Sequence, residues 1–254
     1  MPHMHARRRI VLSQKKIGIG CGTQSAARRA PMSGLTLSQQ YMLLASDPAV
    51  HKLVPPVKQV MQTYVCGAGI AGLLLEGRLR LHENGKLEVV NATPTGSAGA
   101  DLLLAQCSAA AKPKTVRKWI HDLYAHRRFR VPFCDAEMAP LVADGLMSEE
   151  RRKVLFVFPR TVQTPDPAAV HRIVQHIRSG MLAQPPADDA TVLLVMLLDA
   201  SKLLKAYFSP YEQQELRDRL KALQERQVNN WSIVRQVRRA IDEIHVVIVT
   251  TAGM

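Results

Sequence analysis

The chain has 254 residues, of which 47% are hydrophobic and 22% charged, so it can bury a sizeable core as one domain with a tail. Its net charge of +13 favours nucleic acid, anionic membranes or acidic proteins as partners, without choosing among them. Its four cysteines are far apart, which argues against a C-x-x-C zinc site and a dense disulfide framework, and fits a reducing compartment.

The first 33 residues form a basic segment without hydrophobic periodicity. They contain seven arginines and lysines and no acidic residue, whereas 27 basic and 21 acidic residues leave only +6 in 34–254. We expect 1–33 to be a disordered basic tail, sequence upstream of a start at Met32, or an organelle transit peptide, and 34–254 to be the folded domain. The longest apolar run, 64–75, is shorter than the ~18 residues of a transmembrane helix.

Two helices and a hairpin are predicted at the start of the domain. Thr36 and Gln39 form a capping-box pattern, which predicts a short helix beginning there. A second helix is predicted over 57–77, because its apolar residues recur with a helical period. The alternating residues of 79–89 around Asn84-Gly85 predict an antiparallel hairpin with a type I′ turn.

The middle of the domain is predicted to be helical with one irregular stretch. Apolar residues predict helices over 99–110 and 116–123. Residues 126–135 are predicted to be irregular, since Pro132 lies among them, and Pro140 leaves the start of the following helix open.

A second hairpin is predicted over 145–159. Its turn is placed on the charged residues 149–152, and its second strand on the residues that follow. That strand holds consecutive apolar residues, whereas a half-buried strand would alternate. Either one of its faces meets a membrane or a partner, or both faces are buried within the domain. The residues of this run are Val154, Leu155, Phe156, Val157 and Phe158.

The C-terminal third is predicted to consist of helices. Asp166 followed by Pro167 is typical of a helix start. Residues 188–207 are apolar around most of a helical circumference and predict a central buried helix. Amphipathic helices around 216–223 and from Asn230 onward complete the prediction. The predicted fold is mainly α, with a central helical bundle surrounded by amphipathic helices and two β-hairpins.

Gly67, Gly69 and Gly72 satisfy the G-x-G-x-x-G pattern of flavin or nicotinamide-dependent oxidoreductases. That pattern needs a preceding strand, a following helix and a crossover to a parallel strand. Here the preceding segment has a helical period, and the next strands form an antiparallel hairpin. We expect the glycines to lie inside a buried helix where a neighbour approaches closely, with no cofactor and no metal. The oxidoreductase remains the alternative hypothesis.

Six segments in one order carry a resemblance to a known family. Together they resemble the Golgi phosphoprotein 3 family and its bacterial relatives, from about residue 35 to about residue 248. The resemblance implies a helical protein without catalytic activity that binds phosphatidylinositol 4-phosphate, inserts a hairpin into the membrane and, in eukaryotes, sorts Golgi glycosyltransferases. The segments are LTLSQQYMLLASDP, GAGIAGLLLEGRLRL, TPTG, TVRKWIHDL, LVADGLMSEERRKVLFVFP and LLVMLLDASKLLKAYFSPYE.

The same resemblance implies a lipid pocket whose expected residues are replaced in this chain. The family's pocket has a tryptophan and three arginines. Arg127, Arg128 and Arg130 lie near two of these positions and are candidate phosphate ligands, because guanidinium groups bind phosphate through paired hydrogen bonds. A solvated loop is the alternative interpretation. The residues at the expected pocket positions are Val57, Cys66, Val131 and Cys134.

These observations predict a peripheral membrane-binding domain without enzymatic activity. We expect it to recognise anionic phospholipid, a phosphoinositide among the candidates, and to bind membrane-protein clients. We expect it in the cytoplasm, at the Golgi face if the source is eukaryotic. The competing hypotheses are the oxidoreductase and a soluble helical interaction module, and nucleic acid is the less favoured partner.

Overall fold

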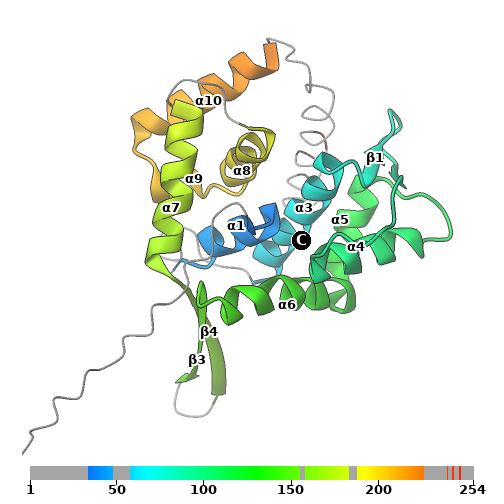
Figure 1. Ribbon diagram of the computed structural model, residues 1–254, viewed down its shortest axis with the longest axis horizontal. Helices are drawn as coiled ribbons and strands as arrows, with labels where there is room; N and C mark the ends of the chain where they lie inside the picture. The colour runs from blue at the N-terminus through cyan, green and yellow to red at the C-terminus, as the bar shows by residue number, and fades with distance from the viewer. Residues whose placement is uncertain are drawn as a thin grey trace, which may run out of the picture.

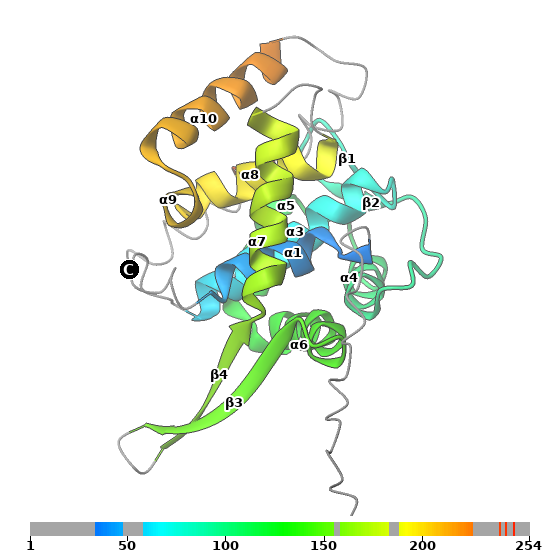
Figure 2. The ribbon, with the colours of Figure 1, turned by 60° about the vertical axis from the view of Figure 1, so that its left-hand side comes forward.

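The computed structural model describes residues 34–47, 58–154, 158–182 and 188–225, together with three residues further on. The predicted tail, 1–33, and most of the predicted helix from Asn230 onward lie outside the described residues. The described part is mainly helical, with two antiparallel two-stranded sheets, which confirms the predicted fold class. The helices gather into one body, and the longer hairpin projects from it (Figures 1 and 2).

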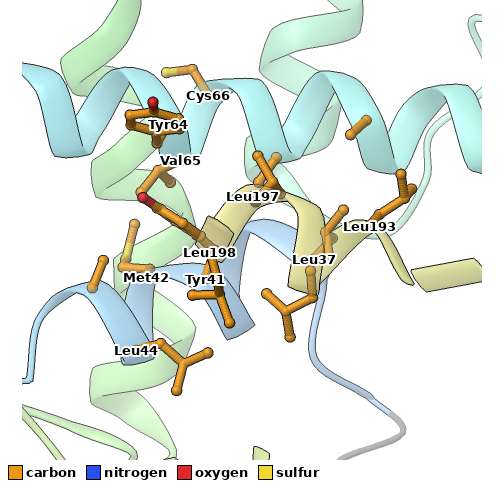
Figure 3. Packing of buried hydrophobic residues seen from close by; sticks show 14 of the residues in the cluster. Leu37, Tyr41, Met42, Leu44, Tyr64, Val65, Cys66, Leu193, Leu197 and Leu198 are labelled. Carbon is orange, nitrogen blue, oxygen red and sulfur yellow. The ribbon is translucent and has the colours of Figure 1, made fainter. Parts of the chain in front are cut away.

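Three helices form the centre of the body: α1 (Leu37–Ala45), α3 (Lys58–Leu75) and α8 (Asp189–Ala200). Side chains of α1 and α8 pack beneath α3 (Figure 3). The predicted capping box is present at the start of α1, since the Thr36 side chain accepts from the Gln39 N–H. Eight consecutive residues of α8, from Thr191 to Leu198, are buried, as expected for a helix that is apolar all round.

The remaining helices surround this centre. On one side lie α4 (Ala98–Ser108), α5 (Val116–Ala125) and α6 (Arg127–Ala143). On the other side lie α7 (Pro167–Ile177), a π-helix (Arg178–Leu182), α9 (Leu204–Tyr207) and α10 (Pro210–Glu225) (Figure 1).

Two helix boundaries test the sequence predictions. Asp166 caps α7 as predicted, because its carboxylate accepts from the N–H groups of Ala168 and Ala169. The single helix predicted over 188–207 is wrong, since the chain breaks after α8. Lys202 there has a φ of +63°, a conformation that ends a helix.

The first hairpin pairs β1 (Leu79–Leu81) with β2 (Leu87–Val89), as predicted. The predicted type I′ turn is wrong, because that turn needs a positive φ at both central residues and only Gly85 has one. Instead, the Gly85 N–H donates to the His82 carbonyl at 2.9 Å inside a wider loop. The loop covers residues 82–86, since Leu81 pairs with Leu87, and Lys86 within it forms a bridge to Thr115 at the start of α5.

The second hairpin pairs β3 (Met147–Val154) with β4 (Phe158–Pro165), and its turn is not where the sequence predicted it. In the register, Met147 pairs with Pro165 and Val154 pairs with Phe158. The charged residues 149–152 therefore lie inside β3. Placing the connection at 155–157, which lies outside the described residues, lets eight positions pair across the strands, and every second pair in such a ladder exchanges two backbone hydrogen bonds.

Helix α6 replaces the irregular stretch predicted over 126–135. Pro132 and Pro140 both lie inside it, although each proline removes a backbone hydrogen bond at a cost of ~3 kcal/mol. Both prolines are on the exposed side of the helix. Phe133 and Leu141 are fully buried beneath them. Burial of this inner face stabilises the helix by tertiary packing, which offsets the two breaks.

Candidate functional site

The three glycines of the G-x-G-x-x-G pattern lie inside the continuous helix α3, as predicted. A Cβ at Gly69 would stand 2.5 Å from Phe133 Cζ, so α6 approaches closely there. The prediction of a close approach is wrong at Gly72, where the nearest atom, Leu37 Cβ, would be 4.0 Å away. Because no strand precedes the glycines in the described chain, they do not form a dinucleotide-binding turn.

Two other features of the described residues limit the choice of site. No group of three His, Cys, Asp or Glu side chains there could hold a metal ion. No helix among them is both long enough and apolar enough to cross a bilayer.

A cavity lies at the root of the β3–β4 hairpin, where α1, α3, α6 and β4 meet. Its volume is about 420 Å³, within the ~300–1,000 Å³ typical of small-molecule sites. Three methionines, Met42, Met61 and Met138, line it together with polar side chains and residues 161–163 of β4. No aromatic side chain is among the described lining residues.

The structure separates the four positions at which the family resemblance places pocket residues. Cys134 lies in the cavity wall. Cys66 is buried and does not line the cavity, Val131 is half-buried outside it, and Val57 lies outside the described residues. Burial raises the pKa of the Cys66 thiol well above its usual value, and the neighbouring Cys134 raises that pKa further. Cys66 is therefore a neutral thiol at a position where the resemblance implies an arginine.

The three candidate arginines lie in the first turn of α6, not in a loop. Arg127 and Arg128 are exposed, whereas Arg130 is only 6% exposed. The Arg130 guanidinium donates to the Leu123 carbonyl at 2.7 Å and to the Tyr124 carbonyl at 2.5 Å. Its Nε donates to Gln62 Oε1 at 3.1 Å. Arg130 thus ties the end of α5 to α3, and Arg127 and Arg128 remain at the surface.

Glu137 is a second buried charge on α6 that sequence reasoning missed. Its carboxylate accepts from Thr36 Oγ1 at 2.7 Å, Ser38 Oγ at 2.8 Å and Ser97 Oγ at 3.0 Å. These donors stand at the starts of α1 and α4, so Glu137 joins three helices. The sequence signal was its seven-residue spacing from Arg130, which places both side chains on one helix face.

The far end of the hairpin combines apolar and basic positions. The apolar run 154–158 spans the end of β3, the connection and the start of β4. Arg152 pairs in register with Arg160, and Lys153 pairs with Pro159. Basic positions therefore flank the apolar end on both strands.

Comparison with known proteins gives one finding. A sequence model described as Golgi phosphoprotein 3 (GPP34) matches residues 37–244. The matched region contains all the described helices from α1 to α10, both hairpins and the cavity. No curated protein matches the chain.

Proposed function

Because the chain belongs to the Golgi phosphoprotein 3 (GPP34) family, we propose that it is a peripheral membrane-binding domain that recognises anionic phospholipid and has no catalytic role. The observation that supports this most is the projecting hairpin, whose apolar end 154–158 is flanked by basic positions (Figure 2). In this proposal the apolar end enters the hydrocarbon and the basic residues meet lipid phosphates.

The expected energies are large enough for reversible attachment. Burying one phenylalanine side chain in an apolar environment stabilises by ~1.5–3 kcal/mol, and the run contains Phe156 and Phe158. A basic residue near an anionic leaflet contributes ~1 kcal/mol, and Arg151, Arg152, Lys153 and Arg160 adjoin the run. The binding free energy from these apolar and basic residues together therefore exceeds that of a single basic residue on the surface.

Arg127 and Arg128 supply a second contact in this proposal. Helix α6 lies along the side of the body from which the hairpin projects (Figure 1). Seventeen residues of helix span ~25 Å, so these two exposed arginines would meet the membrane well away from the hairpin. Arg130 is assigned to holding α3, α5 and α6 together, since its donors are engaged by protein acceptors.

The lipid selectivity that we propose is for negative charge in general. The family resemblance implies phosphatidylinositol 4-phosphate, but Cys66 and Cys134 stand where two of the implied arginines would be, and a cysteine has no guanidinium group. A phosphomonoester is recognised best by several guanidinium groups at once.

From family membership alone, we further propose membrane-protein clients as partners and a position at a cytoplasmic membrane face, that of the Golgi in a eukaryote.

Liposome flotation tests the proposal. We expect recovery with anionic vesicles to exceed recovery with neutral vesicles. The double substitution F156S/F158S should lower it at least about tenfold, since two buried rings are lost. The matched control is Tyr211→Ser, which removes an aromatic side chain that is 77% exposed on α10. Equal recovery with both vesicle types, unchanged in the double variant, would overturn the proposal.

A further inference from the structure

The cavity at the hairpin root contains one basic and one acidic side chain that are not paired. Lys58 is the first residue of α3, Asp135 is on α6, and both line the cavity. Both are exposed, and neither forms an ion pair with a described residue or with the other. The cavity therefore offers one position for an anionic group, at Lys58, and another for a cationic group, at Asp135. Because these two charges are opposite, the described lining has no net charge.

The apolar part of the cavity suits a flexible, partly apolar ligand. Met42, Met61 and Met138 come from three different helices. Methionine side chains are unbranched and polarisable, so they adapt to irregular apolar groups. Cys134 lies in the same wall, and its thiol donates to the Gln62 carbonyl at 3.7 Å.

The cavity stands at the depth where a membrane-bound hairpin would meet lipid head groups. Its wall includes Thr161, Val162 and Gln163, which are three to five residues from Phe158. At ~3.3 Å per residue, this places the wall ~10–17 Å from the apolar end of the hairpin. The head-group layer begins where the ~30 Å hydrocarbon core ends. With the apolar end inside the hydrocarbon, the cavity would open into the head-group layer.

We propose that this cavity binds the phosphoethanolamine head group of a zwitterionic phospholipid, with the phosphate at Lys58 Nζ and the ammonium at the Asp135 carboxylate. An ammonium donates hydrogen bonds to a carboxylate, which strengthens the contact. A choline group cannot donate in this way and is recognised by aromatic cages, whereas the described lining has no aromatic residue. The volume of about 420 Å³ holds a head group and leaves the acyl chains in the bilayer.

This inference rests on the proposed function only for access to lipid in a membrane, so its test uses soluble lipid. Dihexanoyl phosphatidylethanolamine is titrated into the full-length protein below its micellar concentration, and binding is measured by calorimetry. The dihexanoyl phosphatidylcholine and phosphatidylglycerol analogues are titrated in parallel. We expect the ethanolamine lipid to bind at one site and more tightly than the other two lipids.

Two substitutions test which part of the head group each of the two charged residues binds. Asp135→Asn should weaken the ethanolamine lipid about tenfold, as expected for the loss of one charged hydrogen bond, and should leave the glycerol lipid unchanged or tighter. Lys58→Gln should weaken all three lipids, since each has a phosphate. Asp144→Asn is the matched control, because Asp144 is an exposed acidic residue at the end of α6 outside the cavity. Both cavity residues are exposed, so the thermal melting temperature should be unchanged.

The outcomes separate this inference from the proposed function. Equal binding of the three lipids, or an equal effect of Asp135→Asn on all of them, overturns the inference. Selective binding of the ethanolamine lipid by a protein that does not float with vesicles overturns the proposed function and leaves the inference standing. Flotation on anionic vesicles without any binding of soluble lipid overturns the inference and leaves the proposed function standing.

Discussion

The two faces of α6 carry the same kinds of charge and use them differently. Arg130 and Glu137 lie on the inner face, and their charged groups are held by carbonyl and hydroxyl groups of other helices. Arg127, Arg128 and Asp135 lie on the outer face and are exposed. A charge near a proposed binding surface is therefore a candidate ligand contact only if it lies on the outer face, and burial decides which face that is.

The inner-face charges do not neutralise one another. Seven residues of helix separate Arg130 from Glu137 by ~10 Å along the axis. Each is matched instead by several neutral polar partners, and removing a charge would take a hydrogen-bond partner from all of these groups at once. We therefore expect substitutions on the inner face to reduce folding stability, and substitutions on the outer face to affect lipid binding.

The largest effect is expected from Glu137→Ala. It would leave three hydroxyl groups of α1 and α4 without their acceptor, and we expect the free energy of unfolding to fall by ~3–4 kcal/mol. Urea denaturation measures this loss. Asp135→Ala is the matched outer-face variant and should change the stability by less than ~0.5 kcal/mol. Equal losses in the two variants would contradict the distinction between the faces.

A smaller loss is expected from Arg130→Gln, about 2–3 kcal/mol, because two backbone carbonyls at the end of α5 lose a charged donor. The double variant R127Q/R128Q should keep its stability and lose recovery on anionic vesicles, since each arginine contributes ~1 kcal/mol there. Denaturation and flotation of both proteins give the comparison. If the Arg130→Gln protein keeps its stability but no longer floats, the structural role of Arg130 is wrong and Arg130 is a lipid-binding residue.

The apolar part of the inner face gives a third test. Gly69→Ala forces a Cβ against the buried Phe133 ring and should destabilise by ~1–2 kcal/mol despite the better helix propensity of alanine. Gly72→Ala in the same helix meets only Leu37 Cβ at 4.0 Å and should stabilise by up to ~1 kcal/mol. Thermal or urea unfolding should show opposite signs, and the same sign would contradict the close contact at Gly69.

The smallest effect concerns a surface pair outside α6. Arg178 donates to Glu212 at 2.8 Å, and this bond, with the Ser209 N–H, lowers the pKa of Glu212 to about 2. A lowered carboxylate pKa contributes stability above the unfolded value of about 4.3, and that contribution is lost as the pH falls towards 2. Because surface pairs contribute less than ~1 kcal/mol, Glu212→Gln should flatten the stability–pH curve between pH 4 and 2 only slightly. An unchanged curve would show that the pair contributes nothing.

Local patterns predicted much of the fold. Thr36 with Gln39, and Asp166 with Pro167, mark helix starts by hydrogen bonds between near neighbours, which a sequence displays directly. The errors came where distant packing overrode a local rule. Pro132 reads as a helix break, but the burial of Phe133 beside it keeps the helix intact.

The site was less predictable than the fold. The three arginines of the RRFR segment look alike in sequence, yet Arg130 is buried and Arg127 is exposed. The direction of each side chain depends on helix α6, which the sequence did not predict there because of Pro132. Lys58 and Asp135 are far apart in the chain, so only the contact between α3 and α6 brings them to one cavity. No local pattern displays that contact.

The close contact at Gly69 has a consequence for how this cavity can vary among related sequences. Phe133, which fills the space left by the missing side chain, is the neighbour of Cys134 in the cavity wall. A methyl group added at Gly69 would push that ring and shift the wall with it. The shape of the proposed head-group site thus depends on an interior contact, so two homologues with identical cavity-lining residues would differ in the shape of that cavity if one of them had alanine at this position.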